Sequence, residues 1–371
     1  MYGRDLVITG GMNLLYKDDF ERAKTYWKAF WEKELIDRPL VCVTAPKDGA
    51  GQCFYDYSPR HSFNVCMSGR FTENLQAYER VVASTYYGGE AIPSMDITLG
   101  PDQYAGFLGA HIQTREDMET TWAVPVVDDW DSYEVRIDRS SDGYFESMRR
   151  YITAAAEYAK GKFLINMLDL HSNIDALSAL RGPQALCMDL YDSPEQVHRA
   201  LNDVRKTYPE IYDMIYTSGD MGKRGVIGWA PTYCEDGRFA VTQCDFSCML
   251  SPEKVREYVI PAIGEEVSFL KHTVYHYDGK EALSHLDDIL AIKGIDAIQW
   301  VPGDGQPRSP EWMDLLKKIQ KAGKSLWIYD WTVEEIKALH KELLPNQVVY
   351  SVGVSSRAEA DELLEHLAKN T

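Results

Sequence analysis

The sequence has little positive charge for its length. Of its 371 residues, 39 are Lys or Arg and 57 are Asp or Glu, which gives a formal net charge of −18. Nucleic acids and anionic membranes are bound mainly through Lys and Arg side chains that replace their counterions. We therefore expect no nucleic acid and no membrane as a direct partner.

Long apolar runs and signs of export are also missing. No segment approaches the roughly 18 consecutive apolar residues of a membrane-spanning helix. The apolar stretch Leu6–Ile8 is shorter than the core of a secretory signal. The seven cysteines are an odd number without zinc-ribbon spacing, which favours reduced thiols. These features predict a cytoplasmic protein.

The chain has no linker and no nucleotide-binding fingerprint. No glycine/serine tract divides the sequence, so we expect a single domain over residues 1–371. Its paired glycines do not form a G-x-G-x-x-G turn, and no P-loop occurs. A dinucleotide-binding architecture is therefore disfavoured.

The recurring unit is a short apolar segment followed by a polar turn and an amphipathic helix. The apolar segments have the length and the β-branched or aromatic content of buried parallel strands. Strands that alternate with helices over about 300 residues predict an α/β fold, specifically a closed (β/α)8 TIM barrel. The predicted strands are Pro39–Ala45, Pro93–Leu99, Phe163–Leu168, Phe239–Cys244, Thr273–Tyr277, Ala297–Val301, Ser325–Tyr329 and Val348–Gly353.

Two segments fall outside this alternation. Residues 1–37, with an amphipathic helix at Phe20–Leu35, predict an N-terminal helical extension that adds a layer to the barrel. Residues 224–238 precede the fourth strand and contain Gly228-Trp229-Ala230-Pro231. We expect this insertion to form a hairpin or a lid over one face of the barrel.

Acidic residues collect at the predicted strand ends, where barrel enzymes place their chemistry. Asp96, Asp169 and Asp245 each stand at the end of a strand. Carboxylates packed together raise one another's pKa and cost stability, which favours a functional role. Asp96 and Asp245 are candidate catalytic residues, and Asp169 and His171 are candidates for substrate binding. The alternatives are helix capping for the acids and a surface loop for His171.

The pair His276 and Asp278 is the sharpest local pattern. Residues two apart on a strand point to the same side. Together these two could ligate a divalent metal, or act as a base and the acid that orients it. They are therefore candidate catalytic residues and candidate metal ligands. The structural alternative is a histidine hydrogen-bonded in the rim of the barrel.

Polar and aromatic side chains near other strand ends complete the predicted site. Gln299 and Trp300 lie in the segment Gln299–Gly303, and Trp300 could be a platform for substrate. Trp229 and Tyr329 would add aromatic surface. Buried tryptophans more often belong to a core, so a packing role for Trp300 stays open.

Several motifs together resemble the uroporphyrinogen decarboxylase superfamily. They cover most of the chain and match best from Leu180 to Val301. The superfamily is a (β/α)8 barrel and includes the decarboxylase and zinc-dependent methyltransferases that exchange methyl groups with corrinoid proteins. The motifs are Ser94–Ile97, Leu180–Gly182, Asp189–His198, Asp245–Ser247, Leu250–Glu253, Tyr258–Pro261 and His276–Gly279.

The chain departs from both branches of that superfamily. The decarboxylase has an arginine-rich stretch after its first strand, whereas Thr44–Gly49 contains one lysine and no arginine. Binding of a highly anionic tetrapyrrole is therefore not expected. Asp96 stands at the position that resembles the catalytic aspartate. In the zinc motif Asp278 replaces the first cysteine after His276, and Val352 stands near the place of the second.

The resemblance implies a methyltransferase that moves a methyl group between a small methylated compound and a corrinoid carried by a partner protein. Zinc or another divalent metal at His276 and Asp278, with Asp245 as a further ligand, could polarise the leaving atom. An acidic, aromatic lining would suit a methylammonium or methoxy compound. A homodimer is also implied. The alternatives are a lyase or decarboxylase on a small acid, which needs Lys47, Arg308 or Arg357 as a cationic anchor, and a non-catalytic barrel that binds a metabolite.

Overall fold

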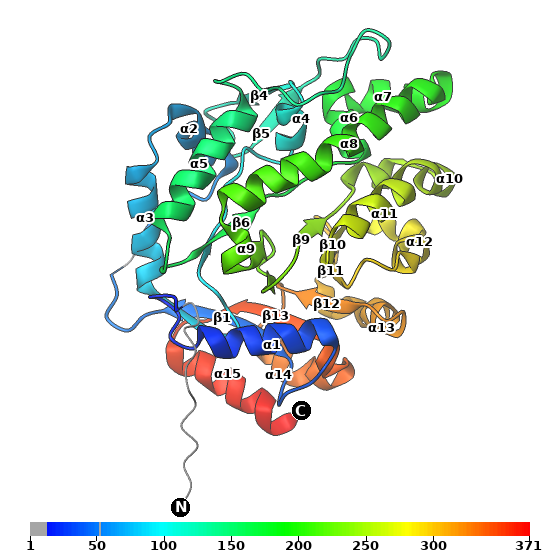
Figure 1. The fold of residues 1–371 in the computed structure, drawn as a ribbon. Helices are drawn as coiled ribbons and strands as arrows, with labels where there is room; N and C mark the ends of the chain where they lie inside the picture. Colours follow the sequence, from blue (N-terminus) through cyan, green and yellow to red (C-terminus); the bar gives the residue numbers. More distant parts are fainter. Residues whose placement is uncertain (1–12, 52) are drawn as a thin grey trace, which may run out of the picture.

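Three sheets and a surrounding layer of helices make up the protein (Figure 1). The computed structural model describes residues 13–51 and 53–371; Leu6–Ile8 and the start of the expected extension lie outside them. The strands are β1 (Leu40–Pro46), β2 (Thr85–Gly89), β3 (Ser94–Met95), β4 (His111–Thr114), β5 (Thr121–Val124), β6 (Leu164–Met167), β7 (Val226–Gly228), β8 (Tyr233–Cys234), β9 (Phe239–Thr242), β10 (His272–Asp278), β11 (Ala297–Val301), β12 (Ser325–Ile328) and β13 (Val348–Gly353).

The largest sheet has seven strands in the order β2-β1-β13-β12-β11-β10-β9. All its neighbours are parallel except β2, which pairs antiparallel with β1. A second sheet has the order β3-β6-β7-β8, and β4 and β5 form a separate hairpin. Each predicted strand has a counterpart among these, with β3 shorter than expected. The fold is therefore α/β with a sheet rich in parallel pairs, as the sequence predicts.

Helices surround these sheets, as βα units require because a parallel strand must be reached by a crossover. The α-helices are α1 (Phe20–Glu32), α2 (Pro59–Ser68), α3 (Thr72–Ser84), α4 (Gln103–Phe107), α5 (Tyr144–Tyr158), α6 (Ile174–Arg181), α7 (Pro183–Asp192), α8 (Pro194–Ser218), α9 (Met221–Arg224), α10 (Pro252–Lys254), α11 (Ile260–Phe269), α12 (Leu286–Ala291), α13 (Met313–Lys321), α14 (Val333–Leu339) and α15 (Arg357–Asn370). Among the described residues, no helix has both the length and the apolar composition that a bilayer crossing requires.

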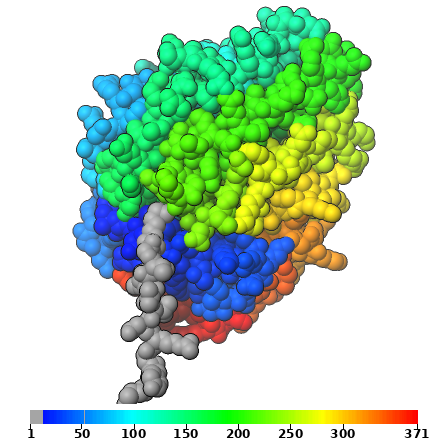
Figure 2. Space-filling view, in the orientation of Figure 1, coloured from blue at the N-terminus to red at the C-terminus, as the bar shows by residue number. Residues whose placement is uncertain are grey.

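The helix predicted in the N-terminal extension is present as α1. It packs against β1 (Figure 1), and both of its tryptophans are hydrogen-bonded to other parts of the chain. Trp27 donates from Nε1 to the carbonyl of Glu90 at 3.0 Å, and Trp31 donates to the carbonyl of Tyr233 at 2.8 Å. Asn346, close to the C-terminal strand, donates to the carbonyl of Lys33. The space-filling view shows the N-terminal and C-terminal parts side by side (Figure 2).

The segment 224–238, expected as a hairpin or a lid, forms a hairpin. It contains a hairpin in which β7 pairs antiparallel with β8, and β7 also pairs in parallel with β6. Val226 and Ile227 are buried, and so are Tyr233 and Cys234. The strands of this segment therefore belong to the second sheet, and burial of their apolar side chains holds them there.

Candidate functional site

His171 lies between two carboxylates at the end of β6. Its Nδ1 is 2.9 Å from Oδ2 of Asp175, and its Nε2 is 3.0 Å from Oδ2 of Asp169. The side chain is only 5% exposed, so His171 is not the surface histidine that its loop position suggested. Burial lowers the pKa of His171, but the two carboxylates outweigh it and hold the pKa well above its ordinary value. The two carboxylates therefore favour the protonated ring, and Nε2 of His171 also lies against Nε2 of Gln243.

Asp175 joins this loop to the one that follows β9. Its carboxylate accepts hydrogen bonds from the backbone N–H groups of Asp245 at 3.0 Å and Phe246 at 2.8 Å. Asp175 lies in the first turn of α6, where Asn173 is the N-cap and accepts from the Asp175 N–H. A capping residue there fixes the start of the helix and with it the direction of the Asp175 side chain.

Gln243 closes the link between the two loops. Its Nε2 donates to both carboxylate oxygens of Asp169, at 2.9 and 3.0 Å. Its backbone carbonyl accepts from Nδ2 of Asn173 at 2.7 Å. The residues Asp169, His171, Asp175 and Asp245, called here the acid–histidine cluster, are thus held from both the β6 and the β9 sides.

Two carboxyl groups have pKa values close to neutral: Asp245, which belongs to this cluster, and Asp96, which lies near Asp169. Enclosure by protein raises the pKa of Asp96 to about 7, and the charge of Asp169 adds to this effect. Enclosure and the charge of Asp175 raise the pKa of Asp245 to about 6, while His171 and His276 act in the opposite direction. Both carboxyl groups still reach solvent. We call the solvent-reached region at these strand ends, where both groups lie, the cup; groups with such pKa values can give or take a proton there.

His276 approaches the same cup from β10. Its Nδ1 donates to Oε1 of Gln299 at 2.7 Å, and the strand register places these two residues side by side. The ring of Trp229 meets the imidazole edge to face, with centroids 5.2 Å apart. Among the sequence-predicted residues, the structure therefore brings together Asp96, Asp169, His171, Asp245, His276, Gln299 and Trp229.

Three predicted residues lie elsewhere. Trp300 is 3% exposed and packs against Tyr277 and Trp312, with centroids 5.8 and 5.3 Å apart, on the opposite face of β11 from Gln299. Asp278 and Tyr329 line a hollow of about 460 Å³ at the ends of β10 to β12, where Asp278 lies two residues beyond His276. Trp300 therefore occupies the packing position that the sequence left open.

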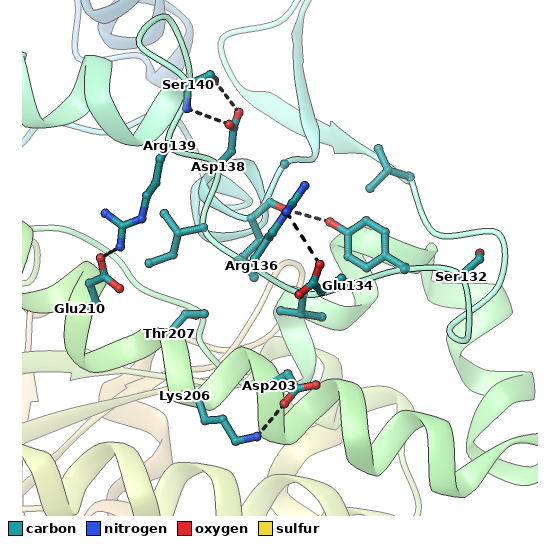
Figure 3. Close-up of a pocket in the computed structure, with 16 residues that line it drawn as sticks. Ser132, Glu134, Arg136, Asp138, Arg139, Ser140, Asp203, Lys206, Thr207 and Glu210 are labelled. Atoms are coloured by element: carbon teal, nitrogen blue, oxygen red, sulfur yellow. Dashed lines mark hydrogen bonds and ion pairs between the residues drawn. The ribbon is translucent and has the colours of Figure 1, made fainter.

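A larger hollow of about 1150 Å³ lies away from these strand ends (Figure 3). It is formed by the segment 132–140 and by α8. Its charged side chains pair with each other: Arg139 with Glu210, Lys206 with Asp203, and Arg136 with Glu134. Asp138 accepts from Ser140. A lining whose charges are neutralised in this way offers no distinct chemistry, so we place the candidate site at the cup.

One group of residues has the spacing of a metal site. His171, Asp175 and Asp245 each offer a ligand atom, and these atoms lie within 4.8 Å of one another; it is the only such group of three or more in the part of the chain that the structure describes. It includes neither His276 nor Asp278. Both nitrogens of His171 are already bonded to carboxylates, and Asp175 accepts from His171 and two backbone N–H groups. One imidazole and two carboxylates are a donor set that suits zinc or another divalent cation. A metal bound here would have to displace the protons that His171 shares with the carboxylates.

The cationic side chains considered as substrate anchors are all engaged outside the cluster. Nζ of Lys47 lies over the ring of Tyr16, and Arg357 pairs with Asp361. Both terminal nitrogens of Arg308 lie 2.9 Å from the carboxylate of Glu335. The cup therefore offers no free cation from these three residues to hold a carboxylate substrate.

Comparison with known proteins adds a fold-level relation. No protein-family model and no curated protein sequence matches this chain. Among solved structures it is similar to a methyltransferase from Methanosarcina mazei. The identity is 13% and the TM-score 0.58, over 94% of this chain and 98% of that one. At this identity the similarity concerns the fold.

Sequence reasoning missed Asp175 and Gln243. Asp175 follows His171 by four residues at the start of a helix, and Asn173 is a typical N-cap residue, so the segment 171–175 carried a recognisable signal. Gln243 directly follows β9 and lies two residues before Asp245, so its polar side chain just after a predicted buried strand was a signal.

Proposed function

We propose that this protein is a methyltransferase that moves a methyl group between a small methylated compound and a corrinoid carried by a partner protein. The observation that carries the proposal is a pair of carboxyl groups with pKa values near neutral: Asp96, with a pKa of about 7, is near Asp169, and Asp245, with a pKa of about 6, is near His171 and His276. The shared fold with a methyltransferase supports it.

We also propose that the chain is one domain and that β1, β3, β6 and β9 to β13 are the strands of a single (β/α)8 barrel. Six of these are neighbours in the large sheet, and β3 and β6 are neighbours in the second. In such a barrel their carboxyl ends meet at one mouth, which agrees with the convergence of residues from β6, β9 and β10 at the cup.

In this proposal the chain's own residues donate a proton to the leaving atom. Demethylation breaks the bond between the methyl carbon and an oxygen or nitrogen. An ether oxygen or a neutral amine nitrogen needs a proton as it departs, whereas a methylammonium nitrogen departs as the neutral amine without one. Asp96, half protonated near neutral pH, would donate this proton, and Asp245 would accept a hydrogen bond from the substrate. The partner's corrinoid would supply the nucleophile that takes the methyl group.

His276 would face the substrate through Nε2, because Nδ1 is bonded to Gln299. Trp229, beside His276, would pack against the apolar part of the substrate. The decarboxylase alternative needs a cationic anchor, and Lys47, Arg308 and Arg357 are engaged elsewhere. The geometry thus favours a neutral or cationic substrate over an acid.

The test is a methyl-transfer assay with free reduced cobalamin and a panel of methoxy and methylamino compounds, followed by the cobalamin absorption spectrum. We expect transfer from at least one compound, reduced by ~10²–10⁴-fold in Asp96→Asn and in His276→Ala, the usual contribution of a general acid or base. Asp203→Asn, in the hollow of Figure 3, is the control and should keep the wild-type rate.

Three outcomes would reject the proposal. One is an unchanged rate in both variants for every accepted compound. Another is release of carbon dioxide from a small acid without methyl transfer, which would establish the lyase. A third is tight binding of a compound without any turnover, which would establish a metabolite-binding protein.

A further inference from the structure

Glu266 is a buried carboxyl group behind the acid–histidine cluster. It lies on α11 and is 2% exposed. Its Oε1 accepts a hydrogen bond from Oγ of Ser172, and its Oε2 has no hydrogen-bond partner among the described residues. An acid placed so deeply with one hydrogen bond needs an explanation, since an unpartnered buried polar atom costs free energy.

Several titratable groups face Glu266, and none of them forms an ion pair with it. On α8, Arg205 directs its guanidinium to Glu265, with Nε 2.6 Å from Oε2, and the hydroxyl of Tyr208 has no partner. On α4, the hydroxyl of Tyr104 interacts with Thr207 at 2.8 Å.

The β6 side contributes His171 and Asp175, whose charges have opposite effects on Glu266. Burial raises the pKa of Glu266 to about 8, although Ser172 and Asn173 favour the ionised form. A buried carboxylate without a paired cation is costly, so at neutral pH Glu266 is a neutral acid.

The contact with Ser172 connects Glu266 to the cluster. Ser172 and Asn173 are fully buried and directly follow His171. Asn173 holds both loops, because its Oδ1 accepts from the Asp175 N–H and its Nδ2 donates to the carbonyl of Gln243. Glu266, on α11, thus contacts the segment Ser172–Asn173, which fixes the position of His171.

The helix that carries Glu266 is irregular just before it. Residues Val255–Val259 form a π-helical segment between α10 and α11, and Pro261 lies in the first turn of α11. A π-turn adds a residue to the turn and changes which side chains face the protein, and such segments occur often at functional sites. Among the α11 positions, Glu266 is buried while Glu265 faces solvent.

We propose that Glu266 is a positioning residue: through Ser172 and Asn173 it holds Asp169, His171 and Asp175, and a change in its charge alters the position of His171. The inference rests on the proposed function only in treating the cluster as the site. Its test uses the protein without substrate, so the two can fail separately.

The test is an NMR titration from pH 6 to pH 10 of the full-length protein labelled with ¹³C at the glutamate carboxyls and with ¹⁵N in the histidine rings. The Glu266 signal is identified by its loss in Glu266→Gln, and the His171 signals by their loss in His171→Asn. We expect Glu266 to titrate with a midpoint near its pKa of about 8, and the His171 signals to shift with the same midpoint.

Glu266→Gln mimics the neutral acid, so in this variant the shift of the His171 signals at that midpoint should be lost. Ser172→Ala removes a donor that favours ionised Glu266, so the midpoint should move to higher pH. A Glu266 that only packs in the core would leave the His171 signals unchanged at that midpoint.

Either of two results overturns the proposal. One is a Glu266 signal that titrates in the ordinary carboxyl range. The other is a His171 transition that is the same in Glu266→Gln as in the wild type, which would be the titration of His171 itself. If Glu266→Gln does not fold, Ser172→Ala decides, because an unchanged midpoint in that variant contradicts the link. Where a methyl-transfer assay succeeds, any change of rate at that midpoint should be absent in Glu266→Gln.

Discussion

His276 donates a hydrogen bond from Nδ1 to Oε1 of Gln299, 2.7 Å away on the neighbouring strand. A carbonyl oxygen can only accept, so Nδ1 carries the proton and, in the neutral ring, Nε2 carries the lone pair. This relationship assigns the tautomer of His276. It also explains why two adjacent residues of β11 differ in role, since Gln299 faces His276 while Trp300 packs against Tyr277 and Trp312.

Gln299→Leu should therefore lower methyl transfer without disturbing the fold. Loss of the acceptor lets His276 adopt either tautomer, and the cost of one such hydrogen bond, about 1–1.5 kcal/mol, corresponds to about a five- to tenfold lower rate. Trp300→Phe is the matched control on the next residue and should keep the rate. The initial rate of the cobalamin assay measures both. A rate in Gln299→Leu equal to the wild type would show that the tautomer is immaterial.

Metal content is the second measurement. Protein purified without chelator or affinity tag should contain far less than one equivalent of zinc or other divalent metal, because both nitrogens of His171 are bonded to carboxylates. Addition of a chelator should leave the melting temperature unchanged. Near-stoichiometric metal that is lost in His171→Asn would contradict this. Metal lost instead in His276→Ala and Asp278→Ala would restore the ligand pair expected from the sequence.

Asp96 should make the protein less stable as the pH rises. Its pKa in the folded protein, about 7, is above the value near 4 of an unfolded chain, so the folded state binds the additional proton between these pH values. Stability from this group is then complete below about pH 4 and is lost as the pH rises through about 7. Asp96→Asn should have a higher melting temperature than the wild type at pH 8 and no advantage at pH 4. Thermal unfolding followed by circular dichroism gives the comparison, with Asp278→Asn as control. A constant difference at all pH values would refute it.

The buried pair of Arg38 and Glu90 should be important for stability rather than activity. Two nitrogens of Arg38 each lie 2.8 Å from a carboxylate oxygen of Glu90, and Glu90 also accepts from the N–H of Val41 at the start of β1. Both side chains are buried. Glu90→Gln should lower the free energy of unfolding by about 3–5 kcal/mol, because it leaves Arg38 charged and unpaired. The double variant Arg38→Met/Glu90→Met should recover much of the loss in denaturant unfolding. A loss below 1 kcal/mol in Glu90→Gln would show that the pair is solvated.

Periodicity and turn chemistry predicted the strands well, because burial of a parallel strand imposes a local and continuous apolar pattern. Ala297–Val301 and Val348–Gly353 agree at both ends with β11 and β13. β3 is shorter than the predicted Pro93–Leu99, since its chain leaves the sheet after Met95 and continues to Asp96 in the cup. The hydrophobic pattern does not show where the hydrogen bonds between neighbouring strands stop.

The family resemblance selected residues of two kinds. Asp96, Asp245 and His276 meet at the cup. Arg181 and Asp189, in two other motifs, instead form an ion pair with Nε 2.7 Å from Oδ2. A motif does not distinguish these roles, because the chemistry of an isolated residue is the same in a structural pair and in a site.

By itself the sequence determined the α/β class, the order of strands and helices, the acidic balance, and the presence of carboxylates and histidines at strand ends, because these depend on local pattern and composition. Only the tertiary structure decided which of those groups meet. It placed His171 between Asp169 and Asp175, turned Trp300 away from Gln299, and put Glu266 behind Ser172. Such contacts join residues up to 94 positions apart. Their distances and the resulting pKa values follow from packing between elements, which no local pattern encodes.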